Sequence, residues 1–288
     1  MDVKICLITG ANSGIGKSAA IQLAQQGHKV IIGCRSQQRG ERALDEIKSR
    51  CSSANVELLI VDLSSQTSIR LLSDHLHKSV ERLDVLIHNA ADFDLSRKEP
   101  VYSEDNIETV WATNHLGPVF LTYLLLDLLK KSDQARIITI ASKGLLSFPF
   151  LKIDFDDPEF KNRKFSVTRA YYQSKLAQVM YTYWLSEELK DTSITVNCIR
   201  VTNVELDLSR YPNLSKLMIF LYSIKRKFSI SPDDMARTYV YLATANELQK
   251  VTGKYFNEKN QAVTSSGFSK CEENIKKLMI LTLKYFHF

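Results

Sequence analysis

A short glycine-rich segment between two apolar stretches constrains this chain most strongly. Gly10, Gly14 and Gly16 follow an apolar run at 3–8 and precede an amphipathic segment at 18–26. This order predicts a strand, a tight turn and a helix. Backbone without Cβ lets an anion approach closely, and free N–H groups at a helix start point toward it. The segment therefore indicates a dinucleotide pyrophosphate site, although glycine turns of this kind also occur for packing reasons alone.

Apolar runs and amphipathic segments go on alternating beyond this first unit. We expect strands at 29–33, 56–61 and 85–88, with helices at 39–50 and 66–80. Short strands separated by helices are typical of a parallel sheet with both faces covered. The sequence thus predicts an α/β fold with a doubly wound, Rossmann-like parallel sheet.

Composition limits the organisation of the chain. Its 288 residues, 44% of them hydrophobic, suffice for one sizeable core, and no repeat or linker-like stretch marks a boundary. We therefore predict a single domain over 1–288. The first strand leaves no room for a signal peptide, and no apolar run reaches the ~18 residues of a membrane span, so a cytoplasmic protein is expected. The five cysteines form no Cys-x-x-Cys pair, which indicates reduced thiols.

The charge distribution and the spacing of histidines and acidic residues bear on two further classes of partner, nucleic acids and metals. The net charge of +6 is spread over the chain without a basic, aromatic-rich block, so we expect no nucleic-acid partner. An anionic cofactor or a membrane surface explains this charge equally well. His75 and His77 lack metal spacing, and the acidic cluster at 154–159 lacks the regularity of a calcium loop. We therefore expect no metal, and a solvated turn at the acidic cluster.

The segment Thr9–Gly16 resembles the cofactor loop of the short-chain dehydrogenases/reductases. Further family elements follow in the family's order over about 260 residues: Asn89-Ala90, Asn114, Ser142 and Tyr171-x-x-x-Lys175. Gly33-Cys34-Arg35-Ser36 and Thr113–Gly117 look most like the retinol-dehydrogenase-like branch. This resemblance implies cofactor contacts at Gly10, Ser13, Gly14, Ile15, Gly16, Arg35, Asp62, Leu63, Asn89, Tyr171, Lys175 and Asn203.

The end of the second strand indicates which cofactor is bound. Folds of this type read the adenosine ribose there, and an acidic residue would hold the 2′-hydroxyl. Here Cys34 and Arg35 replace it, so a guanidinium is available for a 2′-phosphate and NADP is favoured over NAD. Lys17 is expected to add to this charge. The alternative is a solvated arginine in a loop.

Two further cofactor elements rest on the resemblance. Asp62-Leu63 resembles the pair that contacts the adenine, with a capping turn at Asp62 as the alternative. Asn89 corresponds to the asparagine that ties neighbouring strands together. Ala91 replaces the family's glycine, and we expect it to crowd a turn that requires positive φ.

The expected reacting groups lie on a helix over 171–189. Tyr171 and Lys175 are four residues apart and therefore share one face of that helix. Reduction of a carbonyl needs a proton donor, and a tyrosine with a pKa of about 10 becomes useful when a cation stabilises its phenolate. By resemblance, Lys175 also holds the nicotinamide ribose, Ser142 bonds the substrate oxygen, and Asn114 positions a water. Tyr172 creates a local ambiguity, but it lies only three residues before the lysine.

Several segments bear on the substrate and on partners. We expect a substrate-side loop at 143–170 and, by resemblance, a lid at 203–230 whose apolar helix suggests a lipophilic substrate. That helix could instead pack on the core or rest on a membrane surface. A long apolar helix is expected at 105–131, consistent with a homo-oligomer or with burial in the monomer. Val201-Thr202 replaces the family's Pro-Gly beside the nicotinamide.

These observations predict an NADP-dependent oxidoreductase that interconverts a lipophilic carbonyl and its alcohol, with Tyr171 as general acid and base. The intact Asn114, Ser142, Tyr171 and Lys175 support turnover. The changed Pro-Gly element motivates the alternative, a structural or regulatory NADP-binding protein that has lost turnover.

Overall fold

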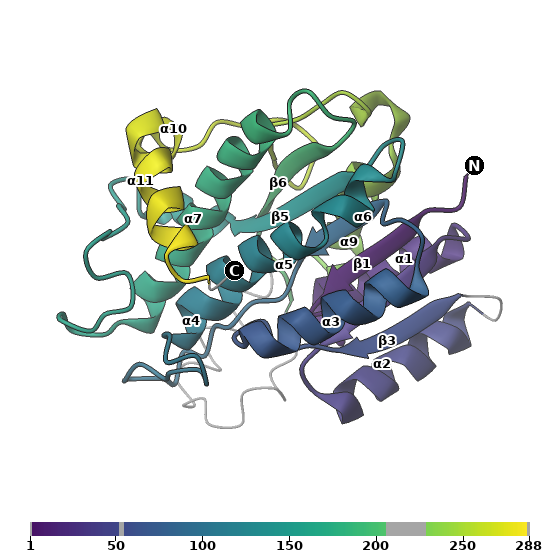
Figure 1. Cartoon of the computed structure of the whole chain (residues 1–288), viewed down its shortest axis with the longest axis horizontal. Coiled ribbons are helices and arrows are strands. Elements are labelled where there is room, and N and C mark those ends of the chain that lie inside the picture. The colour runs from purple at the N-terminus through teal and green to yellow at the C-terminus, as the bar shows by residue number, and fades with distance from the viewer. Residues whose placement is uncertain (1, 52–54, 206–228, 287–288) are drawn as a thin grey trace.

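A parallel sheet runs through the centre of the protein. The computed structural model describes residues 2–51, 55–205 and 229–286. The sheet has seven strands in the order β3-β2-β1-β4-β5-β6-β7 (Figure 1). The strands are β1 (Ile5–Thr9), β2 (Lys29–Cys34), β3 (Val56–Ile60), β4 (Val85–His88), β5 (Arg136–Ser142), β6 (Thr195–Val201) and β7 (Lys254–Phe256). The predicted doubly wound α/β fold is confirmed.

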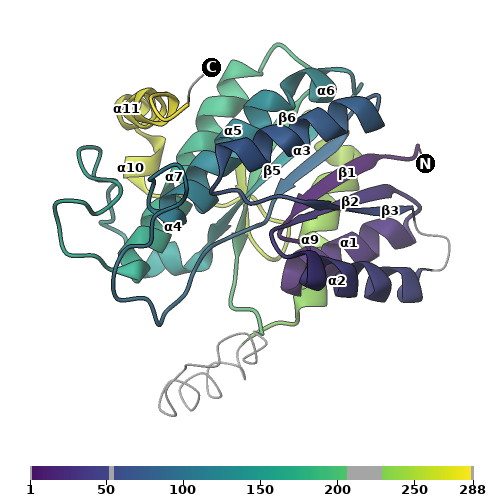
Figure 2. The same cartoon turned by 60° about the horizontal axis from the view of Figure 1, so that its bottom comes forward.

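Helices cover both faces of the sheet. Figure 2 shows α1, α2 and α9 on one face and α3, α5, α6 and α7 on the other. Their bounds are α1 (Gly14–Gln25), α2 (Gln37–Arg50), α3 (Gln66–Ser79), α5 (Gly117–Leu124), α6 (Leu126–Lys130), α7 (Val167–Glu188) and α9 (Pro232–Thr244). Within the described residues, no helix is long and apolar enough to cross a membrane.

The central strands are buried on both sides, as their unbroken apolar sequences predict. On β1, Leu7 belongs to the core beneath α3, α5 and α7, while Cys6 and Ile8 belong to the core beneath α1 and α9. Because these strands are parallel, the carboxyl ends of β1, β2, β4 and β5 meet along one edge of the sheet. This is the edge at which ligands bind in such folds.

The long helix predicted at 105–131 is divided, which corrects the sequence interpretation. It consists of α4 (Thr109–Trp111), a π-helical turn η1 (Ala112–Leu116), α5 and α6. The helix begins late because the Glu108 carboxylate accepts hydrogen bonds from the backbone nitrogens of Val110, at 3.0 Å, and Trp111, at 2.9 Å. Phe120 and Leu121 are fully buried in the monomer. Their apolar character is therefore explained by the core, and the homo-oligomer stays a prediction.

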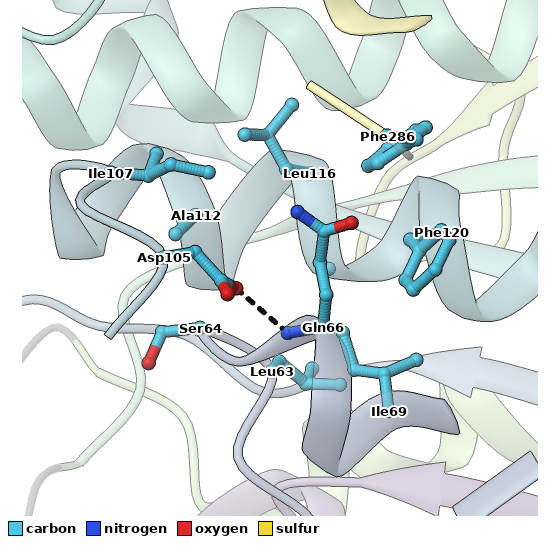
Figure 3. Close-up of a pocket in the computed structure, with 11 residues that line it drawn as sticks. Leu63, Ser64, Gln66, Ile69, Asp105, Ile107, Ala112, Leu116, Phe120 and Phe286 are labelled. Atoms are coloured by element: carbon cyan, nitrogen blue, oxygen red, sulfur yellow. Dashed lines mark hydrogen bonds between the residues drawn. The ribbon is translucent and has the colours of Figure 1, made fainter. Parts of the chain in front are cut away.

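The end of the described chain covers one face of the fold. After α10 (Gly267–Lys270), α11 (Glu272–Leu283) packs on α7 and the π-helical turn, where His115 Nε2 lies 2.8 Å from Thr282 Oγ1. Phe286 stacks on Phe120 with ring centroids 4.8 Å apart, and Figure 3 shows it above a small pocket of about 10 Å³. The C-terminal helix α11 therefore caps this face of the fold.

The acidic cluster at 154–159 is not simply a solvated turn, because two of its members are buried. Asp157 Oδ1 accepts a hydrogen bond from the backbone nitrogen of Lys161 at 2.6 Å. Glu159 Oε2 accepts one from the backbone nitrogen of Glu108 at 3.0 Å. These carboxylates thus accept hydrogen bonds from two backbone N–H groups, one within the loop and one directly before α4. No cluster of metal-ligating side chains is found in the described part of the chain.

Candidate active site

The glycine turn after β1 has the geometry of an anion site. Gly10 and Gly14 have φ angles of 67° and 56°, which side-chain-bearing residues rarely adopt. A Cβ on Gly10 would lie 2.7 Å from Ala90 Cα. Ser13 precedes α1 without a side-chain capping bond, so the first N–H groups of the helix remain available to a ligand. The turn therefore fits a pyrophosphate.

A cleft of about 1210 Å³ opens from this turn across the carboxyl edge of the sheet. It brings together most of the predicted cofactor residues. Those that line it are Gly10, Ser13, Gly14, Ile15, Arg35, Asp62, Leu63, Asn89 and Tyr171. The other predicted site residues do not line it, namely Gly16, Asn114, Ser142, Lys175 and Asn203.

Arg35 stands at the end of the cleft, next to the last residue of β2. Its side chain is 75% exposed, and Nη1 lies 3.8 Å from Asp62 Oδ2. The guanidinium is therefore loosely held and accessible. Asp62 also forms the turn that the sequence offers as the alternative to an adenine contact, since its Oδ1 accepts hydrogen bonds from Ser64 N at 2.9 Å and Ser64 Oγ at 2.7 Å. Lys17 lines the cleft too, but its charge is paired with Glu46.

Asn89 ties β4 to β1 as predicted. Its Nδ2 donates to the carbonyl oxygens of Thr9, at 2.9 Å, and Gly10, at 3.2 Å. Its Oδ1 accepts from the hydroxyl of Tyr239 on α9 at 3.2 Å, a contact that the sequence did not indicate. The expected crowding at Ala91 is wrong, because Ala91 is not among the described residues with positive φ. That position does not require glycine.

Tyr171 and Lys175 share a face of α7, and the helix places Lys175 inside the protein. Lys175 Nζ lies 5.6 Å from the centroid of the Tyr171 ring. The same nitrogen donates to the carbonyl oxygen of Ile140 on β5 at 2.9 Å. Its burial lowers the pKa of the amine to about 8. A cation thus lies beside the tyrosine, in a setting where its charge is sensitive to pH near neutrality.

Asn114 lies in the π-helical turn and contacts α7 through a serine. Its Nδ2 donates to Ser174 Oγ at 3.1 Å, and Ser174 Oγ donates to the carbonyl oxygen of Tyr171 at 2.7 Å. Asn114 is 1% exposed and Ser174 is fully buried. Sequence reasoning missed Ser174, although its place directly before Lys175 put it on the same helix. π-Helical turns occur frequently at functional sites.

Ser142 ends β5 beside Val201, the last residue of β6. Its Oγ accepts a hydrogen bond from the backbone nitrogen of Gly144 at 3.1 Å. The ring of Tyr172 packs directly over Gly144, where a Cβ would lie 2.5 Å from a ring carbon. Burial raises the pKa of Tyr172. Tyr172 therefore packs on the segment that follows β5, and it does not line the cleft.

Phe93 is a second aromatic residue that sequence reasoning missed. Its ring stacks on Tyr171 with centroids 4.0 Å apart and an interplanar angle of 24°. Phe93 follows β4 and lines the cleft together with Tyr171. In the sequence, only the position of Phe93 four residues after Asn89 indicates that it could lie near the site. The cleft thus ends in an aromatic surface at the proposed proton donor.

Comparisons with known proteins identify the family. The pattern of the short chain dehydrogenase family matches residues 4–150. The chain is similar to human retinol dehydrogenase 13, with 37% identity over 257 residues, 88% of this chain and 76% of that protein. It is also 35% identical to human retinol dehydrogenase 14 over 272 residues, 90% of this chain and 79% of that protein.

A solved structure shares the architecture. It is an uncharacterised protein from Mycobacterium paratuberculosis, with a TM-score of 0.74 and 26% identity, covering 98% of this chain and 92% of that one.

Proposed function

We propose that this chain, which belongs to the short-chain dehydrogenase/reductase family and to its retinol-dehydrogenase-like branch, uses NADP to interconvert a lipophilic carbonyl and its alcohol. Its family membership makes it an NAD(P)-dependent oxidoreductase of alcohols and carbonyls. The observation that carries the proposal is that Tyr171 lines the cleft while the buried Lys175 lies behind it, with Nζ 5.6 Å from the centroid of the tyrosine ring.

In the proposed reduction, Tyr171 donates its phenolic proton to the carbonyl oxygen. The Lys175 ammonium favours the phenolate that remains, because an opposite charge lowers the pKa of a phenol. Ser142 donates a hydrogen bond to the same substrate oxygen. When bound in the cleft, the nicotinamide cofactor would supply the hydride. In the reverse direction the Tyr171 phenolate accepts the alcohol proton.

The choice of NADP rests on Arg35. Its exposed guanidinium follows β2, where the adenosine ribose binds in this fold, and no acidic side chain occupies that position. A guanidinium can hold a 2′-phosphate through two hydrogen bonds. Asp62 lies 3.8 Å away and its position leaves the outer side of Arg35 accessible. NADH lacks the phosphate and would gain nothing from this group.

A lipophilic substrate is supported by the retinol dehydrogenase relatives and by the aromatic surface of Phe93 at the cleft. We further propose one domain over 1–288, with a substrate lid at 203–230. Its described ends meet, since Ile230 N donates to Asn203 O and Glu205 N donates to Ile230 O, each at 3.0 Å. Residues 206–228, with the apolar helix predicted there, lie outside the described residues. The cytoplasmic location and the contact with a membrane surface stay predictions.

A second candidate is a regulatory NADP-binding protein without turnover. The observation that favours it is Val201-Thr202 at the end of β6, where the family has Pro-Gly. β6 stays extended through Val201, which pairs with Ser142 on β5. A Pro-Gly pair at 201–202 would end the strand earlier. The backbone proposed to lie beside the nicotinamide is therefore more extended here than a Pro-Gly turn would permit.

Turnover separates the two candidates. Purified protein is mixed with NADPH or NADH and with aliphatic, aromatic, retinoid and steroid carbonyls, and cofactor oxidation is followed by absorbance. We expect oxidation of NADPH with at least one lipophilic carbonyl, and its loss in Tyr171→Phe. Tight NADPH binding without oxidation of the cofactor by any carbonyl would support the regulatory protein instead.

A further inference from the structure

A salt-bridged turn next to the active site connects three side chains, Asp92, Arg97 and Thr109, which we call the Asp92 clip. Arg97 Nη1 and Nη2 donate to the two carboxylate oxygens of Asp92 at 2.8 Å and 3.3 Å. Arg97 Nη1 also donates to Thr109 Oγ1 at 2.9 Å, and Thr109 Oγ1 donates to Asp92 Oδ2 at 3.0 Å. The clip joins the segment after β4 to the first residue of α4.

The backbone of the same turn holds Asn114. The peptide nitrogen of Asp92 donates to Asn114 Oδ1 at 2.6 Å, and Asn114 Nδ2 donates to the carbonyl oxygen of Asp92 at 3.0 Å. Both ends of the Asn114 amide are therefore bound by a single residue. The rotation of this side chain follows the position of the Asp92 peptide.

The next residue reaches the other half of the site. Phe93 stacks on Tyr171 with ring centroids 4.0 Å apart, and both rings pack against an apolar cluster that includes Val110 on α4. Asp92 and Phe93 are consecutive, so a displacement of the turn would move the partner of Asn114 and the ring against Tyr171 together. The clip is the polar connection that fastens this turn to α4.

We propose that Arg97 is a positioning residue for the reaction, acting through the Asp92 turn on both Asn114 and Tyr171. The inference rests on the proposed function, because it assigns Arg97 to the same reaction. Arg97 donates to Asp92 and Thr109, and its proposed effect on Asn114 and Tyr171 passes through the turn.

The geometry distinguishes the clip from an ordinary surface ion pair. Exposed pairs contribute little because two flexible side chains must be held in one geometry. In the clip, the Arg97 and Asp92 side chains are only 17% and 21% exposed, and the guanidinium binds the carboxylate through two nitrogens. Thr109 bonds to both partners, so each of the three groups limits the movement of the other two. Such an arrangement fixes the position of a backbone turn.

A double-mutant cycle on Asp92→Ala and Arg97→Ala tests the proposal. Displacement of a catalytic group by about 1 Å can lower a rate on the order of a hundredfold, so we expect a loss of about tenfold in kcat for each single variant. The double variant should lose no more than either single one, because both changes break the same pair. NADPH affinity, measured by fluorescence titration, should stay within about twofold of wild type. Asp92→Asn, which keeps the acceptor oxygen, should retain more of kcat than Asp92→Ala.

Lys277→Gln is the matched control, since it breaks a surface ion pair with Glu273 on α11, which lies away from the cleft. Its kcat should be unchanged. Unchanged kcat in Arg97→Ala, additive losses in the double variant, or a parallel loss of NADPH affinity would each overturn the proposal.

Hydrogen exchange separates this inference from the proposed function. Arg97→Ala should speed exchange at the Asp92 amide, which bonds Asn114, and Lys277→Gln should not. If wild-type protein reduces no carbonyl, the proposed function fails even when the clip controls exchange at Asp92. If wild-type protein is active and Arg97→Ala keeps both full kcat and normal exchange, only the positioning role fails.

Discussion

The Lys175 ammonium nitrogen donates to the carbonyl oxygen of Ile140, 2.9 Å away, in the interior between α7 and β5. One donated hydrogen bond does not replace the hydration of an ammonium ion, so burial lowers the pKa of this lysine to about 8. The cation proposed to assist Tyr171 is therefore lost within a pH range in which most proteins remain folded.

The first prediction concerns pH. We expect kcat/KM for carbonyl reduction to fall as pH rises above about 8, because neutral Lys175 no longer stabilises the Tyr171 phenolate. Lys175→Met should have a low kcat/KM without this decline. Steady-state rates between pH 6 and pH 10 provide the measurement, and a profile that stays level in the wild type contradicts the role of Lys175.

The lowered pKa of Lys175 also predicts how the free energy of unfolding changes with pH. The folded pKa of about 8 lies below the ordinary lysine pKa of 10.5, so the unfolded state binds more protons between these two values. The contribution of Lys175 to the free energy of unfolding therefore increases as pH rises through this range. Urea titrations at pH 7.5 and pH 9.5, compared with Lys175→Met, should show that this pH dependence is smaller in the variant.

A third prediction separates the two adjacent tyrosines. Tyr171→Phe should lower kcat by about 10²–10⁴-fold, the usual contribution of general acid catalysis, with NADPH affinity nearly unchanged. Tyr172→Phe is the matched control, since it removes the same hydroxyl from a ring that packs over Gly144 and Phe148. It should keep most of kcat. Equal activity in Tyr171→Phe and wild type would remove Tyr171 from the mechanism.

The sequence predicted the fold and the cofactor cleft better than it predicted the contacts inside the site. Alternating strands and helices follow from local periodicity, and the Gly10 turn has a backbone requirement that the sequence displays directly. The Asp92–Arg97 pair and the stacking of Phe93 on Tyr171 depend on segments brought together by folding. No periodicity indicates such contacts.

The errors have local physical causes. The helix predicted at 105–131 begins only at Thr109 because Glu108 satisfies the first backbone nitrogens, and such capping by a buried glutamate is not visible in the apolar pattern. The acidic cluster is interpreted from the sequence as a solvated turn because its spacing lacks the regularity of a calcium loop. Glu159 is buried because its carboxylate serves the backbone of Glu108 and the hydroxyl of Tyr285.

Cofactor choice gives the fourth prediction. A charge-assisted hydrogen bond contributes roughly 1.5–3 kcal/mol, or about ten- to hundredfold in affinity, with the lower end expected at an exposed site. Arg35 is 75% exposed, so Arg35→Ala should weaken NADPH binding about tenfold and leave NADH binding unchanged. Arg42→Ala on the neighbouring helix α2 is the control for loss of a positive charge. Equal weakening of both cofactors by Arg35→Ala would indicate a structural role.

The last prediction concerns the departure at the end of β6. Val201 pairs with Ser142, and both Val201 and Thr202 are β-branched and favour extended backbone. Replacing them by the family's pair, Val201→Pro with Thr202→Gly, should allow a tighter turn beside the nicotinamide. We expect kcat to rise while NADPH affinity changes little, because a misplacement near 1 Å at the hydride donor can cost on the order of a hundredfold in rate. Thr202→Gly alone controls for added flexibility and keeps the Val201 strand end. If the wild type oxidises no NADPH and the double variant is equally inert while binding NADPH tightly, the regulatory protein becomes the better description.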